Sequence, residues 1–187
     1  GAGVHNGPGA VLTALNCSFI ANTNIGSGDS GGGGVDNHGE EATATLMNCE
    51  FSRNSAPFGG GLSNYSGAAI TLDRCLFYDN SASGFGGAII NRWTAILTAK
   101  NCTIAANNGG PGGALANHGG LTATISNSVV WGNSGNQIWF SGGVGTVTFT
   151  TLEDLAAVVA QNLDGGGNIS ADPLFVDAAN GDYRLQA

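Results

Sequence analysis

Apolar and polar positions alternate with a period of two in five short segments of this chain, each centred on a threonine. Apolar or small residues stand on both sides of each threonine, as around Thr13 and Thr98. This period indicates a β-strand, because successive side chains of a strand point to opposite faces. The complete set is Thr13, Thr45, Thr71, Thr98 and Thr124. Within these segments no apolar stripe with a period of 3.6 is long enough for a helix.

Three other signatures recur in step with the threonines. A cysteine, or once a serine, follows each threonine at the fourth position: Cys17, Cys49, Cys75, Cys102 and Ser128. An F-x-x-N element, softened in its last two copies, begins at Phe19, Phe51, Phe77, Ile104 and Val130. A glycine-rich segment ends at Asn6, Asn37, Asn64, Asn91 and Asn117. The cysteine positions are 32, 26, 27 and 26 residues apart, and a period in this range indicates stacked supersecondary units.

The repeat unit contains three short predicted strands: the threonine strand, the strand with cysteine and phenylalanine, and the end of the glycine-rich segment. Three strands in ~26 residues without a helix predict one coil of a parallel β-helix, whose equivalent strands stack ~4.8 Å apart. A leucine-rich repeat has this period but needs an L-x-x-L-x-L frame, which is missing, and a propeller blade needs four strands. The handedness of parallel crossovers predicts a right-handed helix. The fold class is therefore all-β.

Stacking places equivalent residues over one another. The phenylalanine column is then an internal apolar spine, and the asparagines form ladders at the corners. Paired glycines mark points where a side chain would collide or where φ is positive. All four cysteines are predicted to point inward as free thiols, because in-register parallel strands give poor disulfide geometry. No C-x-x-C spacing indicates zinc.

Two regions depart from the repeat. The first coil is about five residues longer than the others, and the excess, Thr23–Gly31, is predicted to protrude as a flexible loop. After Asn133, two segments, 137–140 and 146–149, look like the strands of one further coil. The chain is therefore predicted to be a single domain, residues 1–187, with regular repeats over 1–133 and irregular coils over 134–187.

The irregular part contains one predicted helix, residues 152–162. Its apolar positions follow i, i+3, i+4, i+7 and i+11 spacing: Leu152, Leu155, Ala156, Val159 and Leu163. Thr150 with Glu153 forms a capping box, and the glycines at 165–167 end the helix. In the tail, 168–185, two apolar pieces are joined by a turn at 179–181.

The composition limits the classes of function that the chain can have. The net charge is −8 and Lys100 is the only lysine, which excludes nucleic acid, because phosphates require a basic surface. No apolar run approaches the ~18–20 residues of a membrane span. The chain has no signal peptide and does not begin with methionine, so we expect a mature protein or a fragment. The Gly-, Ser-, Thr- and Asn-rich composition is typical of secreted bacterial proteins.

A calcium site is the main candidate for chemistry. The tail offers hard oxygen ligands in a turn-rich stretch: Asp172, Asp177, Asn180 and Asp182. Weaker candidates are Asp164 with Asn168, and Asp29 in the long loop. No other cofactor is expected.

A shared metal ion between His38 and His118 is not expected. They occupy one column, three coil steps apart, which is roughly 14 Å. Both, and His5, are therefore predicted to be loop or surface residues. The threonine column resembles one rank of an ice-binding face, but the second rank contains only Thr43 and Thr122.

Catalysis has little support in the sequence. Glu50, Asp73 and Asp79 do not repeat into a cluster of carboxylates, and the polygalacturonase-type motifs are absent. Lys100 stands alone, with Arg74 one column position away, as a base for a lyase. The prediction is a protein that is not an enzyme; a carbohydrate-binding or carbohydrate-active protein is the alternative.

The paired G-G-A-[ILV] and F-x-x-N repeats over residues 1–133 resemble those of the polymorphic outer membrane protein family, whose passenger domains are right-handed β-helices. The tail, A-D-P-L-F-V-D-A-A-N-G-D-Y-R-L, resembles a segment of secreted bacterial β-helix proteins with the pectate-lyase-like superfold. The resemblance implies an extracellular or cell-surface location and a structural or adhesive role. The sequence departs from that family in lacking a translocator barrel and a second tail repeat. Open coil ends also suggest end-to-end stacking into a fibre.

Overall fold

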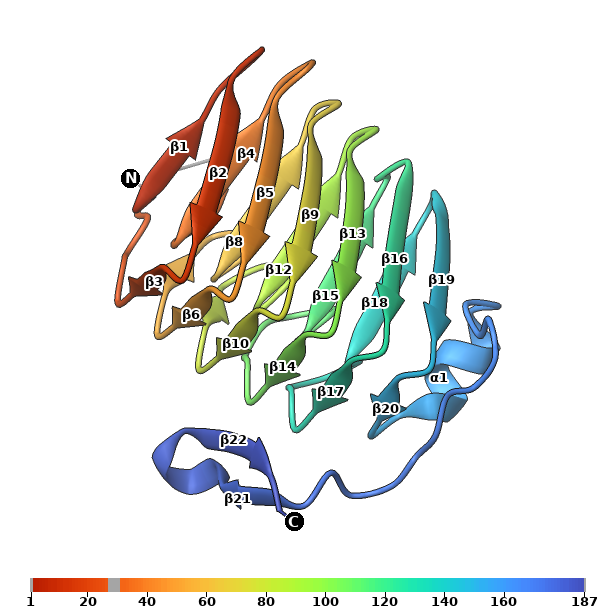
Figure 1. Cartoon of the computed structure of the whole chain (residues 1–187). Coiled ribbons are helices and arrows are strands. Elements are labelled where there is room, and N and C mark those ends of the chain that lie inside the picture. Colours follow the sequence, from red (N-terminus) through yellow and green to blue (C-terminus); the bar gives the residue numbers. More distant parts are fainter. Residues whose placement is uncertain (1, 27–30, 187) are drawn as a thin grey trace.

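The computed structural model describes residues 2–26 and 31–186, which form a parallel β-helix of three six-stranded sheets (Figure 1). Sheet A contains β1 (Val4–Asn6), β4 (Val35–His38), β8 (Leu62–Tyr65), β12 (Ile89–Arg92), β15 (Leu115–His118) and β18 (Ile138–Ser141). Sheet B contains β2 (Val11–Leu15), β5 (Thr43–Met47), β9 (Ala69–Asp73), β13 (Ile96–Lys100), β16 (Thr122–Ser126) and β19 (Val144–Thr148). Sheet C contains β3 (Ser18–Ile20), β6 (Glu50–Ser52), β10 (Leu76–Tyr78), β14 (Thr103–Ala105), β17 (Val129–Trp131) and β20 (Thr151–Leu152). A short fourth sheet pairs β7 (Ser55–Ala56) with β11 (Ser81–Ala82).

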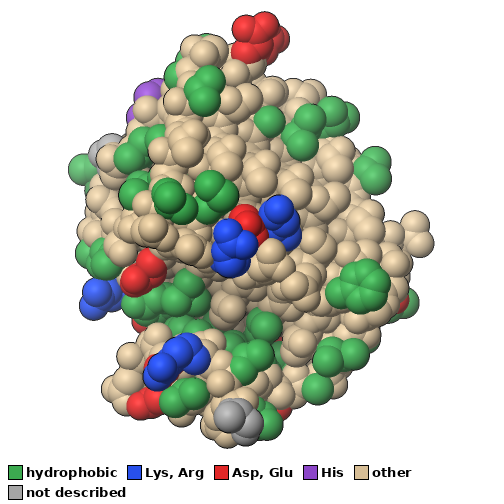
Figure 2. All heavy atoms as spheres, in the orientation of Figure 1, with side chains coloured by type: hydrophobic (Ala, Val, Ile, Leu, Met, Phe, Trp, Pro, Cys, Tyr) green, Lys and Arg blue, Asp and Glu red, His purple; other side chains and the backbone are tan. Residues whose placement is uncertain are grey.

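The predicted columns are confirmed by the strand register. The threonine column runs in step across sheet B and gains a sixth member, Thr146. The apolar column likewise runs in step across sheet C. Each member pairs with the next in the predicted order Phe19, Phe51, Phe77, Ile104 and Val130. Figure 2 shows that the face in front, formed largely by sheet B, carries few charged side chains.

The core is the predicted apolar spine. The Phe51 ring stacks on Phe19 at 4.7 Å and on Phe77 at 4.4 Å between centroids. All four cysteines are free thiols, and three of them are buried. The Cys17 thiol donates to the carbonyl oxygen two residues earlier, as the three buried thiols do, but it is exposed. Cys17 belongs to the first coil, so a neighbouring coil covers it on one side only.

Two asparagine ladders hold the corners. In one ladder each amide nitrogen donates to the amide oxygen of the next asparagine at 2.7–2.8 Å, through Asn6, Asn37, Asn64, Asn91 and Asn117. In the other the distance is 2.9 Å, through Asn22, Asn54, Asn80, Asn107 and Asn133. These side chains also bond backbone groups that the corners would otherwise leave buried and unpaired.

Each glycine pair has both predicted roles. The first glycine is in the left-handed region, as at Gly59 (φ 62°) and Gly86 (φ 70°). The second lies against the next coil: a Cβ atom on Gly60 would come within 2.4 Å of the Gly87 carbonyl oxygen. The first position favours glycine for its conformation and the second for its lack of volume.

The predicted helix is shorter than expected. α1 spans Leu155–Ala160, and Leu152 is a buried residue of β20. Leu152 pairs with Val130 of β17, so strand pairing overrides its helical pattern. The N-cap is Asp154, which accepts from the Ala157 amide at 3.1 Å.

The predicted capping box and helix face are therefore wrong in part. The Thr150 hydroxyl donates to the Thr148 carbonyl oxygen instead of capping a helix. Val158 is buried, whereas Val159 is 54% exposed. α1 lies at the β18 and β19 end of the stack (Figure 1), so the predicted end-to-end stacking would meet a helix on this side.

The long first-coil loop is fixed at both described ends. Thr23 bridges to Ser55 and Gly31 to Phe58, and the Asn24 amide donates to the Gly31 carbonyl oxygen at 2.6 Å. Residues 27–30, with the candidate ligand Asp29, lie outside the described residues, so the predicted flexibility of this loop stays a prediction.

The tail is a hairpin beside sheet C. β21 (Phe175–Asp177) and β22 (Asp182–Leu185) pair antiparallel around the 3-10 helix η1 (Ala178–Asn180). Figure 1 shows the hairpin below β10, β14 and β17. It packs there through Tyr183, whose ring lies 5.3 Å from that of Tyr78. None of the described helices is long and apolar enough to cross a bilayer.

Candidate functional site

The outer face of sheet A carries a band of aromatic rings. Alternation along each strand explains it: Val35 and Asn37 of β4 point into the helix, so Asp36 and His38 point outward. Equivalent outward residues of neighbouring strands then lie side by side. We call the following residues the aromatic strip: His5, His38, Phe58, Tyr65, Phe85, Arg92, Trp93, His118 and Trp139.

The strip begins at the first coil. The His5 and His38 rings are 4.9 Å apart, and His38 stacks on Tyr65 at 5.1 Å. Tyr65 then meets Trp93 edge-on at 5.9 Å. Trp93 lies at the turn that follows β12 and is 40% exposed. These four rings therefore cross the first four coils in one line.

The second half of the strip uses rings from the turns before sheet A. Phe58 stacks near Phe85 at 6.0 Å, and Phe85 stacks on Trp139 of β18 at 5.2 Å, with an interplanar angle of 11°. His118 lies 5.5 Å from Phe85 and 5.9 Å from Trp139. The strip therefore extends to the last strand of sheet A.

Arg92 joins the two halves. Its guanidinium carbon lies 4.8 Å from the centre of the Phe58 ring, 5.0 Å from that of Tyr65 and 4.3 Å from that of Trp93. Only 2% of Arg92 is exposed. Cation–π contacts of this kind fix the three rings relative to one another. The strip is thus a rigid surface with its one arginine held beneath it.

A cluster of titratable groups lies at the first-coil end of the strip. His5 Nδ1 is 2.9 Å from Asp36 Oδ2, and one ligand atom each of His5, Asp36 and His38 lies within 4.8 Å of the others. Burial raises the pKa of Asp36, and the nearby His5, His38 and Arg92 oppose that rise. In the described part of the chain, this is the one group of three His, Cys, Asp or Glu side chains able to hold an ion.

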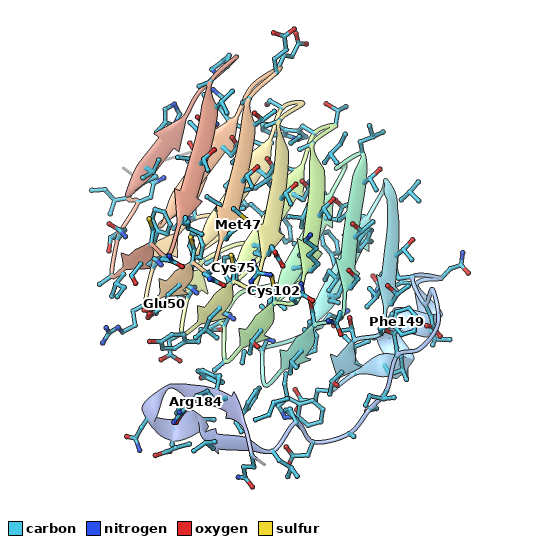
Figure 3. The ribbon with its side chains drawn as sticks, viewed as in Figure 1. Met47, Glu50, Cys75, Cys102, Phe149 and Arg184 are labelled. Carbon is cyan, nitrogen blue, oxygen red and sulfur yellow. The ribbon has the colours of Figure 1, made fainter. Side chains whose placement is uncertain are left out.

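The predicted calcium ligands are partly gathered by the hairpin. Asp177 and Asp182 pair across it, and Asn180 donates to Asp177 at 2.7 Å. Both oxygens of Asp182 contact Arg184, at 2.8 and 2.5 Å, and this partner lowers the pKa of Asp182 to about 2. Arg184 projects from the hairpin (Figure 3).

The remaining calcium candidates make local bonds. Asp172 accepts from the Leu174 amide at 2.9 Å, which is an Asx turn. Asp164 accepts from the side chain of Asn168 at 2.7 Å. The calcium site stays a prediction.

The candidate carboxylates of catalysis have separate partners. Asp73 pairs with Arg74 at 3.0 Å and accepts from Asn101 at 2.7 Å. Glu50 accepts from Ser52 and Tyr78, both at 2.9 Å, and Asp79 is exposed. A pocket of about 290 Å³ lies between β17 and the hairpin, lined mostly by apolar side chains such as Trp131, Phe175 and Tyr183.

Sequence reasoning compared histidines along one column and so missed the cluster. The column from His38 through Tyr65 and Arg92 towards His118 is present. His5 of β1, however, pairs with Asp36 of the neighbouring strand β4, two positions before His38 on the same face of that strand. The available signal was the outward position of all three: the second residue of V-H-N, and the second and fourth of V-D-N-H.

The family model described as "Right handed beta helix region" matches residues 2–152. This match agrees with the predicted handedness and covers every strand of the three six-stranded sheets. No curated protein and no solved structure matches the chain.

Proposed function

The chain belongs to the right-handed β-helix family, and we propose that it is a non-enzymatic, secreted or cell-surface protein that adheres to glycans through the aromatic strip. The observation that carries this proposal is the two lines of partly exposed rings, from His5 to Trp93 and from Phe58 to Trp139, which Arg92 joins. Contiguous apolar patches on a soluble surface mark binding sites more often than they arise by chance.

The strip has the chemistry of a sugar-binding surface. An aromatic face packs against the apolar C–H side of a pyranose ring, while a polar edge such as the indole nitrogen of Trp139 bonds its hydroxyl groups. Because the rings are held by stacking and by Arg92, binding orders few additional side chains.

The length of the aromatic strip favours a polymeric glycan as the ligand. Sheet A has six strands, and strands spaced ~4.8 Å apart give a strip on the order of 24 Å long. That length accommodates several sugar units in a row. The net charge of −8 and the burial of Arg92 favour neutral over acidic glycans.

The location is supported by composition and by the repeat. Few lysines and many Gly, Ser, Thr and Asn residues are typical of secreted proteins. The G-G-A-[ILV] and F-x-x-N signatures resemble those of polymorphic outer membrane proteins, which supports a surface role. The candidate carboxylates Glu50 and Asp73 each have separate partners, which favours adhesion over hydrolysis.

The test is glycan binding by the purified chain, on an array of neutral and acidic glycans and then by calorimetry. Trp139→Ala, alone and with Tyr65→Ala, should weaken binding at least tenfold. Phe149→Ala is the matched control, because Phe149 is an aromatic residue that is 70% exposed and lies away from the strip (Figure 3). If the protein binds no glycan, or if Phe149→Ala weakens binding as much as Trp139→Ala, the proposal is overturned. Release of reducing ends from a bound glycan would overturn its non-enzymatic part.

A further inference from the structure

We propose that His5, Asp36 and His38 form a binding site for a divalent transition-metal ion of the zinc class, which joins strands β1 and β4. The inference does not rest on glycan binding, although His5 and His38 also belong to the aromatic strip. It lies at one end of the aromatic strip, on the outer face of sheet A.

The backbone already brings the three ligands together. His5 and Asp36 are register partners on adjacent parallel strands, and Asp36 and His38 are two residues apart on the same face of β4. Ligands around tetrahedral zinc are about 3.3 Å apart, since the metal–nitrogen and metal–oxygen bonds are about 2.0–2.1 Å. His5 Nδ1 and Asp36 Oδ2 are 2.9 Å apart, and no two of the three ligand atoms are more than 4.8 Å apart. The spacing that zinc requires lies between these two distances. Only small side-chain rotations are needed.

The cluster contains polar atoms that a metal would satisfy. Asp36 Oδ1 and His38 Nδ1 are buried, and neither has a hydrogen-bond partner among the described residues. Asp36 is only 7% exposed. The bond from His5 uses the other oxygen, Oδ2. An unpaired buried polar atom costs free energy, so its presence calls for an explanation that the hydrogen bond to His5 does not supply.

The packing around Asp36 keeps its carboxylate in place. A Cβ atom on Gly31 would lie 3.0 Å from Asp36 Oδ1 and 2.1 Å from the Ser63 hydroxyl, so the glycine backbone closes over this side. His38 is held between the His5 and Tyr65 rings. The side chain of His5 is 58% exposed, which leaves a path by which an ion enters.

The donor set selects the metal. Two imidazoles and one carboxylate suit zinc, nickel, cobalt, copper or ferrous iron, whereas calcium and magnesium require oxygen ligands. Three protein ligands also leave a fourth position for water or an external ligand.

The test is metal binding by the full chain with Cys17→Ser as background, which removes the exposed thiol as a competing ligand. Zinc is titrated by calorimetry, and cobalt(II) is followed by its visible ligand-field absorption. We expect one ion per chain and a higher thermal midpoint with zinc. Calcium at the same concentrations should not displace cobalt(II) from the site.

Two variants remove ligands while preserving the stack. His38→Phe keeps a ring against Tyr65, and His5→Phe changes an exposed side chain, so both should fold. Each should weaken zinc binding by roughly 100-fold or more, because losing a direct ligand should cost more than losing an outer-shell partner, which typically costs about 10–100-fold. The control is His118→Phe in the same column, which should bind like the parent. No bound metal at millimolar zinc, or equal binding by His38→Phe and His118→Phe, would overturn the proposal.

Discussion

The side chain of Gln161 donates a hydrogen bond from Nε2 to the carbonyl oxygen of Ile138, at 2.9 Å. Its Oε1 accepts one from the amide of Phe140, also at 2.9 Å. Ile138 and Phe140 belong to β18, the last strand of sheet A. One side-chain amide therefore takes the place of the backbone groups that a following strand would offer. An edge strand closed in this way has fewer groups left for pairing with another chain.

Gln161→Leu should destabilise the protein by about 2 kcal/mol, because it leaves two backbone groups of β18 without their partner. It should also increase concentration-dependent self-association. Urea unfolding and sedimentation velocity measure the two effects. Gln186→Leu is the control: its amide also donates to a backbone oxygen, that of Phe175, but in the exposed tail. Equal behaviour of the two variants would show that the bonds of Gln161 do not protect the edge.

Asn80→Ala should lower the free energy of unfolding, measured in urea, by about 3 kcal/mol or more. Asn80 accepts from the amide and side chain of Asn54 and donates to Asn107 and to the Phe51 carbonyl oxygen, all buried. Removing it leaves several of these groups unpaired inside the stack. Asn108→Ala changes an exposed asparagine outside the ladders and should have little effect. A small loss for Asn80→Ala would mean that water replaces the ladder.

Ala106→Gly should raise the stability, and Gly132→Ala should lower it, each by about 1 kcal/mol. The two residues occupy equivalent corners of successive coils, and both have positive φ, 55° and 65°. The space at Gly132 is open, since an added Cβ would meet its nearest atom at 3.9 Å. The effect therefore reports conformation rather than a steric clash. Thermal unfolding of the two variants should shift in opposite directions, and shifts in the same direction would contradict this explanation.

The coils were predictable because each column repeats one physical requirement. Stacking puts Phe51 over Phe77 and Asn54 over Asn80, so the same demand for apolar volume or for an amide returns every coil. One sequence therefore shows, in successive coils, several residues that meet the same structural requirement. The register followed from that repetition alone.

What breaks the repeat was not predictable in the same way. The pattern of Leu152 fitted a helix, but pairing with Val130 put it in a strand, and tertiary pairing is invisible to a local period. The cap by Gln161 is a contact over more than twenty residues with no motif. The cluster of His5 with Asp36 requires comparing different residue types on adjacent strands, which a column of identical residues does not reveal.

Thiol titration should separate Cys17 from the other cysteines. In the native protein one of the four thiols should react rapidly with a disulfide reagent at neutral pH, because Cys17 is exposed and the other three are buried. Burial raises the pKa of Cys49, and the Cys102 thiol together with burial raises that of Cys75, which lies beside Cys102 in Figure 3. A raised pKa lowers the fraction of reactive thiolate at neutral pH, so burial and chemistry act in the same direction for Cys49 and Cys75. The hydrogen bond with Cys75 lowers the pKa of Cys102, so burial alone slows the reaction of that thiol.

Cys17→Ser should abolish the rapid phase and leave three slow thiols, all of which react at once in denaturant. The rate of the slow phase then measures how often the inner coils open. Cys75→Ser is the opposite control, because it should keep the rapid phase and remove one slow thiol. Two or more rapid thiols in the native parent would show that the cysteine column opens to solvent, and would contradict the packing of the spine around Phe51 and Phe77.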